Sequence, residues 1–219
     1  MKKSAYVLAF DEVQKPVTDF LRSAGFKKSG RTYNRLVGDG LVHVINFQMG
    51  QYPIGNYVIP GIRESEYGKF VVNLGVYLPC VSQIESGKTG NRIIQEYDCH
   101  IRERLGVLAE GRDVWWSLDS SPEVTGNLMV SLLQKFGLPF LSPYTDYPSV
   151  LSQYRAYGEL PFSNQARSAL IAAIICHHLG DFQSAAKFFD KAASWAVTSN
   201  NASFGSYVEK IRKAENSSA

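Results

Sequence analysis

The chain has 219 residues, of which 45% are hydrophobic and 20% are charged, and its formal net charge at pH 7 is +3. This length and composition predict a globular protein with a substantial core, organised as one large domain or as a domain with an appendage. Because the net charge is small, it does not by itself indicate a nucleic-acid or membrane partner.

Nothing in the sequence indicates export or membrane insertion. No stretch approaches the ~20 apolar residues that a membrane span requires, and the N-terminal residues lack the apolar run of a signal peptide. Cys80, Cys99 and Cys176 are odd in number and widely spaced, which argues against a disulfide framework and fits a reducing compartment. We therefore expect a cytoplasmic protein with no membrane partner.

The first part of the chain predicts a helix and a strand. We expect the helix from Asp11 to Ala24, where apolar residues recur at helical spacing and Gly25 follows as a stop. Residues 31–37 are typical of a strand, and residues 38–40 of a turn.

Five basic residues gather in this region and are interleaved with Phe26 and Tyr33: Arg22, Lys27, Lys28, Arg31 and Arg35. Such a cluster can contact phosphates, but clustered Lys and Arg usually serve solubility and protect sheet edges. We do not expect nucleic acid to be a partner.

Residues 41–49 and 69–78 predict the two central strands, because both runs are rich in β-branched and aromatic residues. Successive side chains of a strand point to opposite faces. One face is therefore apolar, and the other presents Asn46, Gln48, Asn73 and Tyr77. These groups donate and accept hydrogen bonds, so this face is a candidate binding surface. The alternative is that they simply hydrogen-bond a covering segment.

The connection between these strands, residues 50–68, is too long for a plain hairpin. Loops of this length are often functional, so Tyr52, Tyr57 and Arg63 are candidate contact residues.

Residues 91–118 carry the other candidate site residues. Part of 91–106 is expected to be helical, since Tyr97, Ile101 and Leu105 are spaced by four. Residues 114–118 predict a strand, with Trp116 buried and Trp115 nearer the polar face.

Arginine beside an aromatic ring offers an anion clamp and a stacking surface. This makes Arg102, Arg104 and Trp115 binding candidates. A helix is expected over residues 122–136, ended by Gly137.

No catalytic constellation is evident. Cys99 and His100 are adjacent in the sequence, but neighbours on a helix point in different directions, and a nucleophile must meet its base at hydrogen-bond distance. Paired zinc ligands, a phosphate-binding glycine loop and a serine elbow are all missing from the sequence. We therefore expect no catalytic residue, no metal and no cofactor.

Five blocks of sequence together resemble a bacterial family catalogued as domain of unknown function 4304: residues 25–33, 45–48, 70–76, 99–106 and 115–116. The resemblance covers roughly residues 5–141. It implies an α+β domain and supplies no activity, substrate or site residue.

The last third is expected to be helical. Residues 166–197 resemble a single tetratricopeptide unit, with a turn at residues 179–182 and with Ala185, Phe189 and Ala192 at the packing positions of its second helix. Because such repeats normally need about three neighbours, we expect this hairpin to dock on the sheet domain or on a second subunit. The sequence thus predicts an α+β domain over 1–141 and a helical extension over 142–219.

The predicted fold is α+β, with an antiparallel sheet of about four strands packed by helices. The predicted function is a non-catalytic module that binds a protein partner, for example an immunity-like protein that blocks a toxin. The alternative is an enzyme or small-molecule binder with a polar pocket between sheet and helices. Six residues would line this pocket: Asn46, Gln48, Asn73, His100, Arg102 and Trp115.

Overall fold

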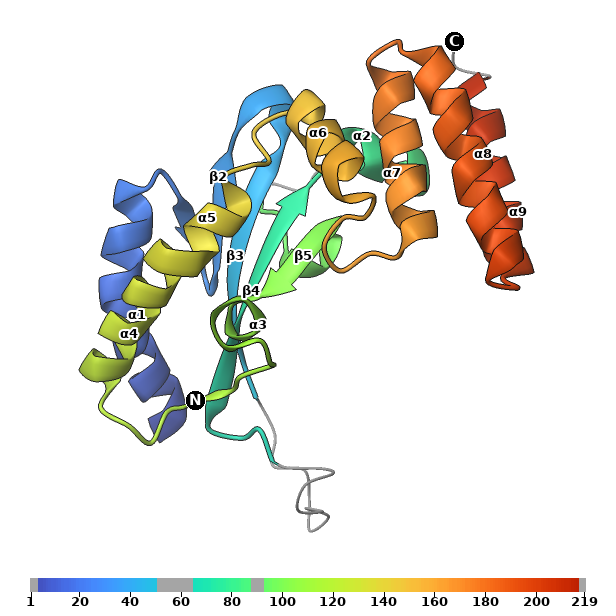
Figure 1. Ribbon diagram of the computed structural model, residues 1–219. Coiled ribbons are helices and arrows are strands. Elements are labelled where there is room, and N and C mark those ends of the chain that lie inside the picture. Colours follow the sequence, from blue (N-terminus) through green and yellow to red (C-terminus); the bar gives the residue numbers. More distant parts are fainter. Residues whose placement is uncertain (1–3, 51–64, 88–92, 217–219) are drawn as a thin grey trace. The chain divides into compact units, whose positions relative to one another are not determined.

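The computed structural model describes residues 4–50, 65–87 and 93–216 (Figure 1). These residues form an antiparallel sheet packed by helices, followed by a helical C-terminal region, so the α+β prediction is confirmed. The strands are β1 (Lys27–Ser29), β2 (Thr32–Leu36), β3 (Val42–Met49), β4 (Lys69–Tyr77), β5 (Ile101–Arg104) and β6 (Trp116–Ser117). The helices are α1 (Ala5–Ser23), α2 (Pro79–Ser86), α3 (Leu105–Glu110), α4 (Pro122–Leu132), α5 (Leu138–Leu141), α6 (Tyr147–Tyr157), α7 (Gln165–His178), α8 (Phe182–Thr198) and α9 (Ala202–Asn216).

The sheet has six strands rather than the expected four. Its order is β1-β2-β3-β4-β5, and β6 also pairs with β4, in the register Phe70↔Trp116. The sequence prediction missed β1, a short strand whose three residues are all exposed, and β5. Short strands carry too little periodicity to be recognised from sequence.

The described chain divides into two compact units, each assembled from separate segments. The first comprises Met1–Arg35, His43–Gly75 and Glu103–Ser142, and the second comprises Leu36–Val42, Val76–Arg102 and Pro143–Ala219. The boundary between residues 141 and 142 expected from the sequence stays a prediction.

An aromatic cluster forms the core of the first unit. Phe10 of α1 lies with its ring centroid 5.2 Å from that of Phe70 and 6.3 Å from that of Phe47, and all three rings are buried. Helix α4 packs beside α1 (Figure 1). Gly126 allows this close approach, because a Cβ there would lie 2.7 Å from Pro16 Cγ.

Side-chain hydrogen bonds join helices and loops in the second unit. The Tyr147 hydroxyl, from α6, accepts the Cys80 N–H of α2 at 3.0 Å, and the Tyr147 N–H donates to an Asp39 carboxylate oxygen at 3.0 Å. Helices α7 and α8 form the expected hairpin, with Gly180 in the left-handed region and Asp181 capping α8. Helix α9, which the sequence prediction missed, packs on α8.

Three helical predictions were wrong in detail. Helix α1 begins at Ala5 rather than Asp11, because the Ser4 hydroxyl caps its N-terminus. Pro16 lies within this helix. Within residues 93–106 the helical part is limited to a 3-10 turn at Glu96–Asp98 and the start of α3, and Ile101 lies in β5 rather than on a helix. The helix expected over residues 122–136 does not stop at Gly137, because a π-helical turn, Leu133–Gly137, connects α4 to α5.

No helix in the three described ranges is both long enough and apolar enough to cross a membrane. The candidate contact residues Tyr52, Tyr57 and Arg63 lie outside the described residues.

Candidate functional site

The polar residues of β3 and β4 bond to neighbouring strands of the first unit. Asn46 Nδ2 donates to Thr32 Oγ1 at 2.9 Å, and Asn73 Nδ2 donates to Gln48 Oε1 at 3.1 Å. Asn73 is 4% exposed, whereas Gln48 is exposed and Asn46 is half-buried. The alternative considered above had these groups bond a covering segment, whereas Asn46 and Asn73 bond polar side chains of adjacent strands.

Arg104 and Trp115 come together in the first unit, as an Arg–aromatic site requires. The Arg104 guanidinium carbon lies 5.8 Å from the centroid of the Trp115 ring, and Arg104 also pairs with Asp113. Both partners of this ion pair are more than a third exposed, so we expect it to add little stability. Trp115 and Trp116 are both half-buried, so the expected full burial of Trp116 is not observed.

Tyr77 and His100 meet in the second unit, with ring centroids 5.6 Å apart. His100 Nδ1 accepts the backbone N–H of Leu78 at 3.1 Å, and the backbone N–H of His100 donates to Val76 O at 3.0 Å. A nitrogen that accepts an N–H carries no proton itself, so His100 is neutral in this arrangement.

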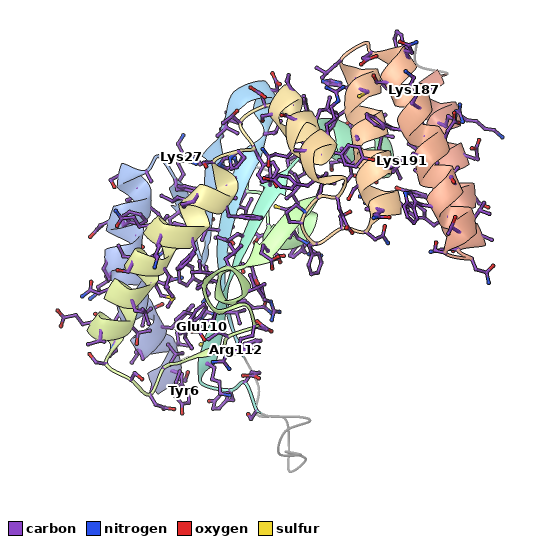
Figure 2. The ribbon with its side chains drawn as sticks, in the orientation of Figure 1. Tyr6, Lys27, Glu110, Arg112, Lys187 and Lys191 are labelled. Atoms are coloured by element: carbon purple, nitrogen blue, oxygen red, sulfur yellow. The ribbon has the colours of Figure 1, made fainter. Side chains whose placement is uncertain are left out.

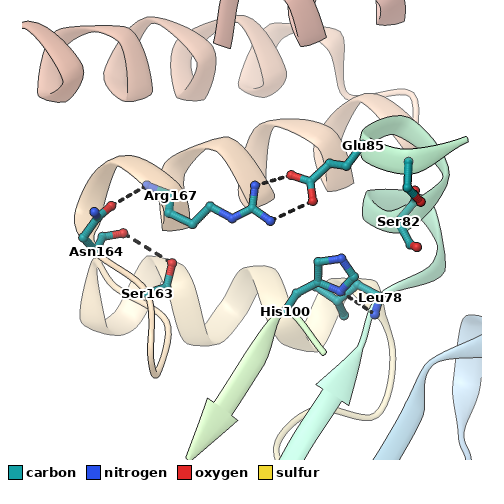
Figure 3. A network of polar contacts seen from close by, with 8 residues as sticks. Leu78, Ser82, Glu85, His100, Ser163, Asn164 and Arg167 are labelled. Carbon is teal, nitrogen blue, oxygen red and sulfur yellow. Dashed lines mark hydrogen bonds and ion pairs between the residues drawn. The ribbon is translucent and has the colours of Figure 1, made fainter. Parts of the chain in front are cut away.

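His100 lies beside an ion pair that joins two helices (Figure 3). Arg167 of α7 contacts both carboxylate oxygens of Glu85 of α2, with a distance of 2.8 Å from Nη2 to Oε2. Tyr207 of α9 hydrogen-bonds to this pair. Burial lowers the pKa of Arg167, but the hydrogen bond and charge of Glu85 outweigh it and raise that pKa overall.

Arg102 forms a second cluster of the second unit, which we call the Arg102 patch: Glu96, Arg102 and Phe162. Arg102 Nη1 lies 3.2 Å from Glu96 Oε1, and the guanidinium carbon lies 4.3 Å from the centroid of the Phe162 ring. Glu96 thus holds the guanidinium against the face of an aromatic ring.

Phe162 has a backbone conformation that is unusual for a bulky residue. Its φ is +57° and its side chain is 71% exposed. It lies in a turn closed by a hydrogen bond of 3.1 Å from Ser163 N–H to Leu160 O. The third position of a type II turn needs a positive φ and is normally Gly or Asn, because a side chain there is strained.

Further hydrogen bonds anchor this turn to the start of α7. Leu160 N–H donates to Ser168 Oγ at 2.9 Å, and Asn164 Oδ1 accepts Arg167 N–H at 2.8 Å (Figure 3). Strained residues persist only where surrounding contacts fix them, and such strain gathers at functional sites.

The sequence reasoning missed Glu85, Arg167, Tyr207 and Phe162. Pro161 and Asn164 indicate a turn followed by a helix cap, so the position of Phe162 in a turn could be predicted from the sequence. The contact between Phe162 and Arg102 could not be predicted, because no sequence pattern relates these two residues.

The electrostatics of Cys99 and His100 do not favour nucleophilic catalysis. Burial, together with the charges of Glu96 and Asp98, raises the pKa of the Cys99 thiol well above its ordinary value. The thiol donates to Gln95 O at 3.6 Å. A catalytic cysteine instead needs a lowered pKa and an adjacent base. Among the described residues, no cluster of His, Cys, Asp and Glu is arranged to hold a metal ion.

We expect His100 to make stability pH-dependent. Burial lowers its pKa from 6.5 to about 4, although the charge of Glu85 opposes this shift. Between these values the unfolded chain binds the proton and the folded chain does not. Stability should therefore fall with decreasing pH in this window, by at most about 1.4 kcal/mol per pH unit.

Urea unfolding at several pH values, for wild type and His100→Asn, measures this effect. Asparagine keeps an acceptor for Leu78 N–H but does not titrate, so its profile should be flatter below pH 6.5. Parallel profiles would show that His100 is not responsible.

The sheet, its packed helices and the helical C-terminal region define the chain as an α+β protein. A family model described as "Domain of unknown function (DUF4304)" matches residues 17–143, which is more than half of the chain, and the chain therefore belongs to this family. This confirms the family expected from the sequence. Neither a curated protein nor a solved structure matches the chain.

Proposed function

We propose that this protein is a non-catalytic interaction module that binds a protein partner through the Arg102 patch. The observation that carries the proposal is the conformation of Phe162. A positive φ costs a bulky residue about 1–2 kcal/mol, yet this side chain is 71% exposed and gains little from burial in return. An exposed aromatic side chain on a strained backbone is the expected anchor for a partner.

Arg102 strengthens the proposal because arginine and aromatic residues are enriched in binding hot spots. Its side chain is 27% exposed and is already held by Glu96. A partner would therefore meet an ordered side chain and would lose less conformational entropy on binding.

The helical hairpin offers a second surface of suitable character. Its exposed apolar residues lie at the turn between α7 and α8 and towards the end of α8: Leu179, Phe182, Trp195 and Val197. These residues lie in two places, at the start and near the end of α8, and each could contact a partner. We propose that this hairpin acts as a tetratricopeptide-like unit.

The setting that we propose is the cytoplasm of a bacterium. Three buried cysteines, all in the thiol form, suit a reducing compartment. An immunity protein that binds and blocks a toxin is one concrete form of the proposal.

Affinity capture with the tagged protein tests this function. Wild type, Phe162→Gly and Tyr157→Ala are each used to retain proteins from native lysate, which are then quantified by mass spectrometry. Glycine suits a positive φ, so Phe162→Gly should stay folded while it loses the ring. Tyr157 is the matched control, an aromatic residue that is 77% exposed outside the Arg102 patch.

The proposal predicts a protein that wild type and Tyr157→Ala retain and that Phe162→Gly does not. Equal retention by all three would remove Phe162 from the binding surface. If wild type retained nothing specifically, the interaction function itself would be rejected.

A further inference from the structure

Two cations lie over one stripe of α1 in the first unit. Phe10, Gln14 and Thr18 are four residues apart and share a helix face. The Arg31 guanidinium carbon lies 4.6 Å from the centroid of the Phe10 ring, and Lys28 Nζ lies 3.1 Å from Thr18 Oγ1. The hairpin of β1 and β2 thus places positive charge against the helix.

Arg35 extends this row of cations along β2. Tyr33 and Arg35 share one face of β2, and Arg31 lies in the turn immediately before this strand. The Arg35 guanidinium carbon lies 4.7 Å from the centroid of the Phe26 ring, and Arg35 Nη1 donates to Ala24 O at 3.1 Å. Lys28 pairs in register with Tyr33, between the two arginines. We call Lys28, Arg31 and Arg35 the basic row.

The environment of the basic row disfavours its charged side chains, so a bound anion would stabilise them. Burial lowers the pKa values of all three side chains, and the charge of nearby Arg22 lowers that of Lys28 further. Asp11 acts in the opposite direction on Lys28 and Arg31. An added anion would favour the charged forms and would relieve the repulsion between Arg22 and Lys28.

Two buried donors also lack partners in this region. The side-chain nitrogen of Gln14, a residue that is 3% exposed, and Arg35 Nε are buried without a hydrogen bond within the described part of the chain. A buried donor without a hydrogen bond destabilises the folded state. Packing alone would be served better by apolar residues, so these polar groups call for a functional explanation.

The spacing of the row indicates the kind of ligand. Arg31 and Arg35 stack on different rings, Phe10 and Phe26, so they do not converge on one small anion. An extended peptide with acidic residues at alternate positions places a carboxylate about every 6.6 Å. The rings beneath the row are buried and offer no stacking surface for nucleic-acid bases.

We propose that the basic row binds an extended acidic segment of a protein partner. This surface belongs to the first unit, whereas the Arg102 patch belongs to the second, so it is an additional binding surface. It rests on the proposed function only in taking the partner to be a protein. The probe that tests it is a synthetic peptide, so its result does not depend on capturing a natural partner.

Fluorescence anisotropy with a labelled peptide of alternating Glu and Ser tests the proposal at low salt. Wild type should bind, and added salt should weaken binding because exposed charges are screened. Lys28→Gln and Arg31→Gln should each weaken binding about tenfold, the scale of one charge-assisted hydrogen bond. Circular dichroism verifies that each variant is folded.

Lys27→Gln is the matched control, because it removes the same charge from the neighbouring residue of β1. Alternation places Lys27 on the opposite strand face from Lys28, and its side chain is exposed (Figure 2). It should change affinity less than Lys28→Gln by several fold. Equal losses in these two variants, or no binding at low salt, would overturn the proposal. So would a random single-stranded oligonucleotide that bound more tightly than the peptide.

Discussion

Replacing Phe70 by alanine is expected to lower the free energy of unfolding by about 3–5 kcal/mol. Its side chain is fully buried, and its ring centroid lies 5.2 Å from that of Phe10 and 5.8 Å from that of Trp116. The substitution removes these ring contacts and leaves a cavity between α1 and the sheet. Domains of this size are stable by only about 5–15 kcal/mol, so this loss is a large fraction of the total stability.

Urea denaturation of wild type, Phe70→Ala and Phe182→Ala measures this effect. Phe182 is 55% exposed on α8, so its loss should cost below about 1 kcal/mol. Similar losses at the two positions would contradict the assignment of the core to Phe10, Phe47 and Phe70.

Breaking the ion pair between Glu85 and Arg167 is expected to have the next largest effect. Their side chains are 17% and 28% exposed, so neither charge is well solvated. Arg167→Met should lower the free energy of unfolding by about 2–3 kcal/mol, because it leaves the Glu85 carboxylate partly buried without its partner.

A double-mutant cycle tests this mechanism. Glu85→Gln combined with Arg167→Met removes both charges, so the double variant should be more stable than Arg167→Met alone. Additive losses would show that the pair contributes no coupling, and that α2 and α7 are held by packing alone.

The two central strands were predictable because both runs are rich in β-branched and aromatic residues. Leu41, Ile45 and Phe47 are buried, as their spacing indicates, but β4 is buried on both faces, so its Asn73 and Tyr77 do not form an exposed polar face. Tyr97, Ile101 and Leu105 were expected to share one helix face, but they lie in three different elements, the 3-10 turn, β5 and α3. Local patterns therefore located long elements better than short ones.

The candidate site was predictable only in part. Arg104 and Trp115 lie close in the sequence and do meet. Tyr77 of β4 also meets His100, which immediately precedes β5. Glu85 and Arg167 are 82 residues apart, and nothing in the sequence indicates their pairing. The positive φ of Phe162 could not be predicted from the sequence either, because Gly or Asn normally occupies such a turn position.

The stability of Phe162→Gly tests the central claim most directly. If the Phe162 ring is held for a partner, glycine should relieve the backbone strain and offset the lost contact with Arg102. The free energy of unfolding should then match wild type within about 1 kcal/mol and exceed that of Phe162→Ala, which keeps a Cβ at positive φ. A loss of about 3 kcal/mol, as for a buried aromatic residue, would show that the ring is structural and contradict its role as an anchor.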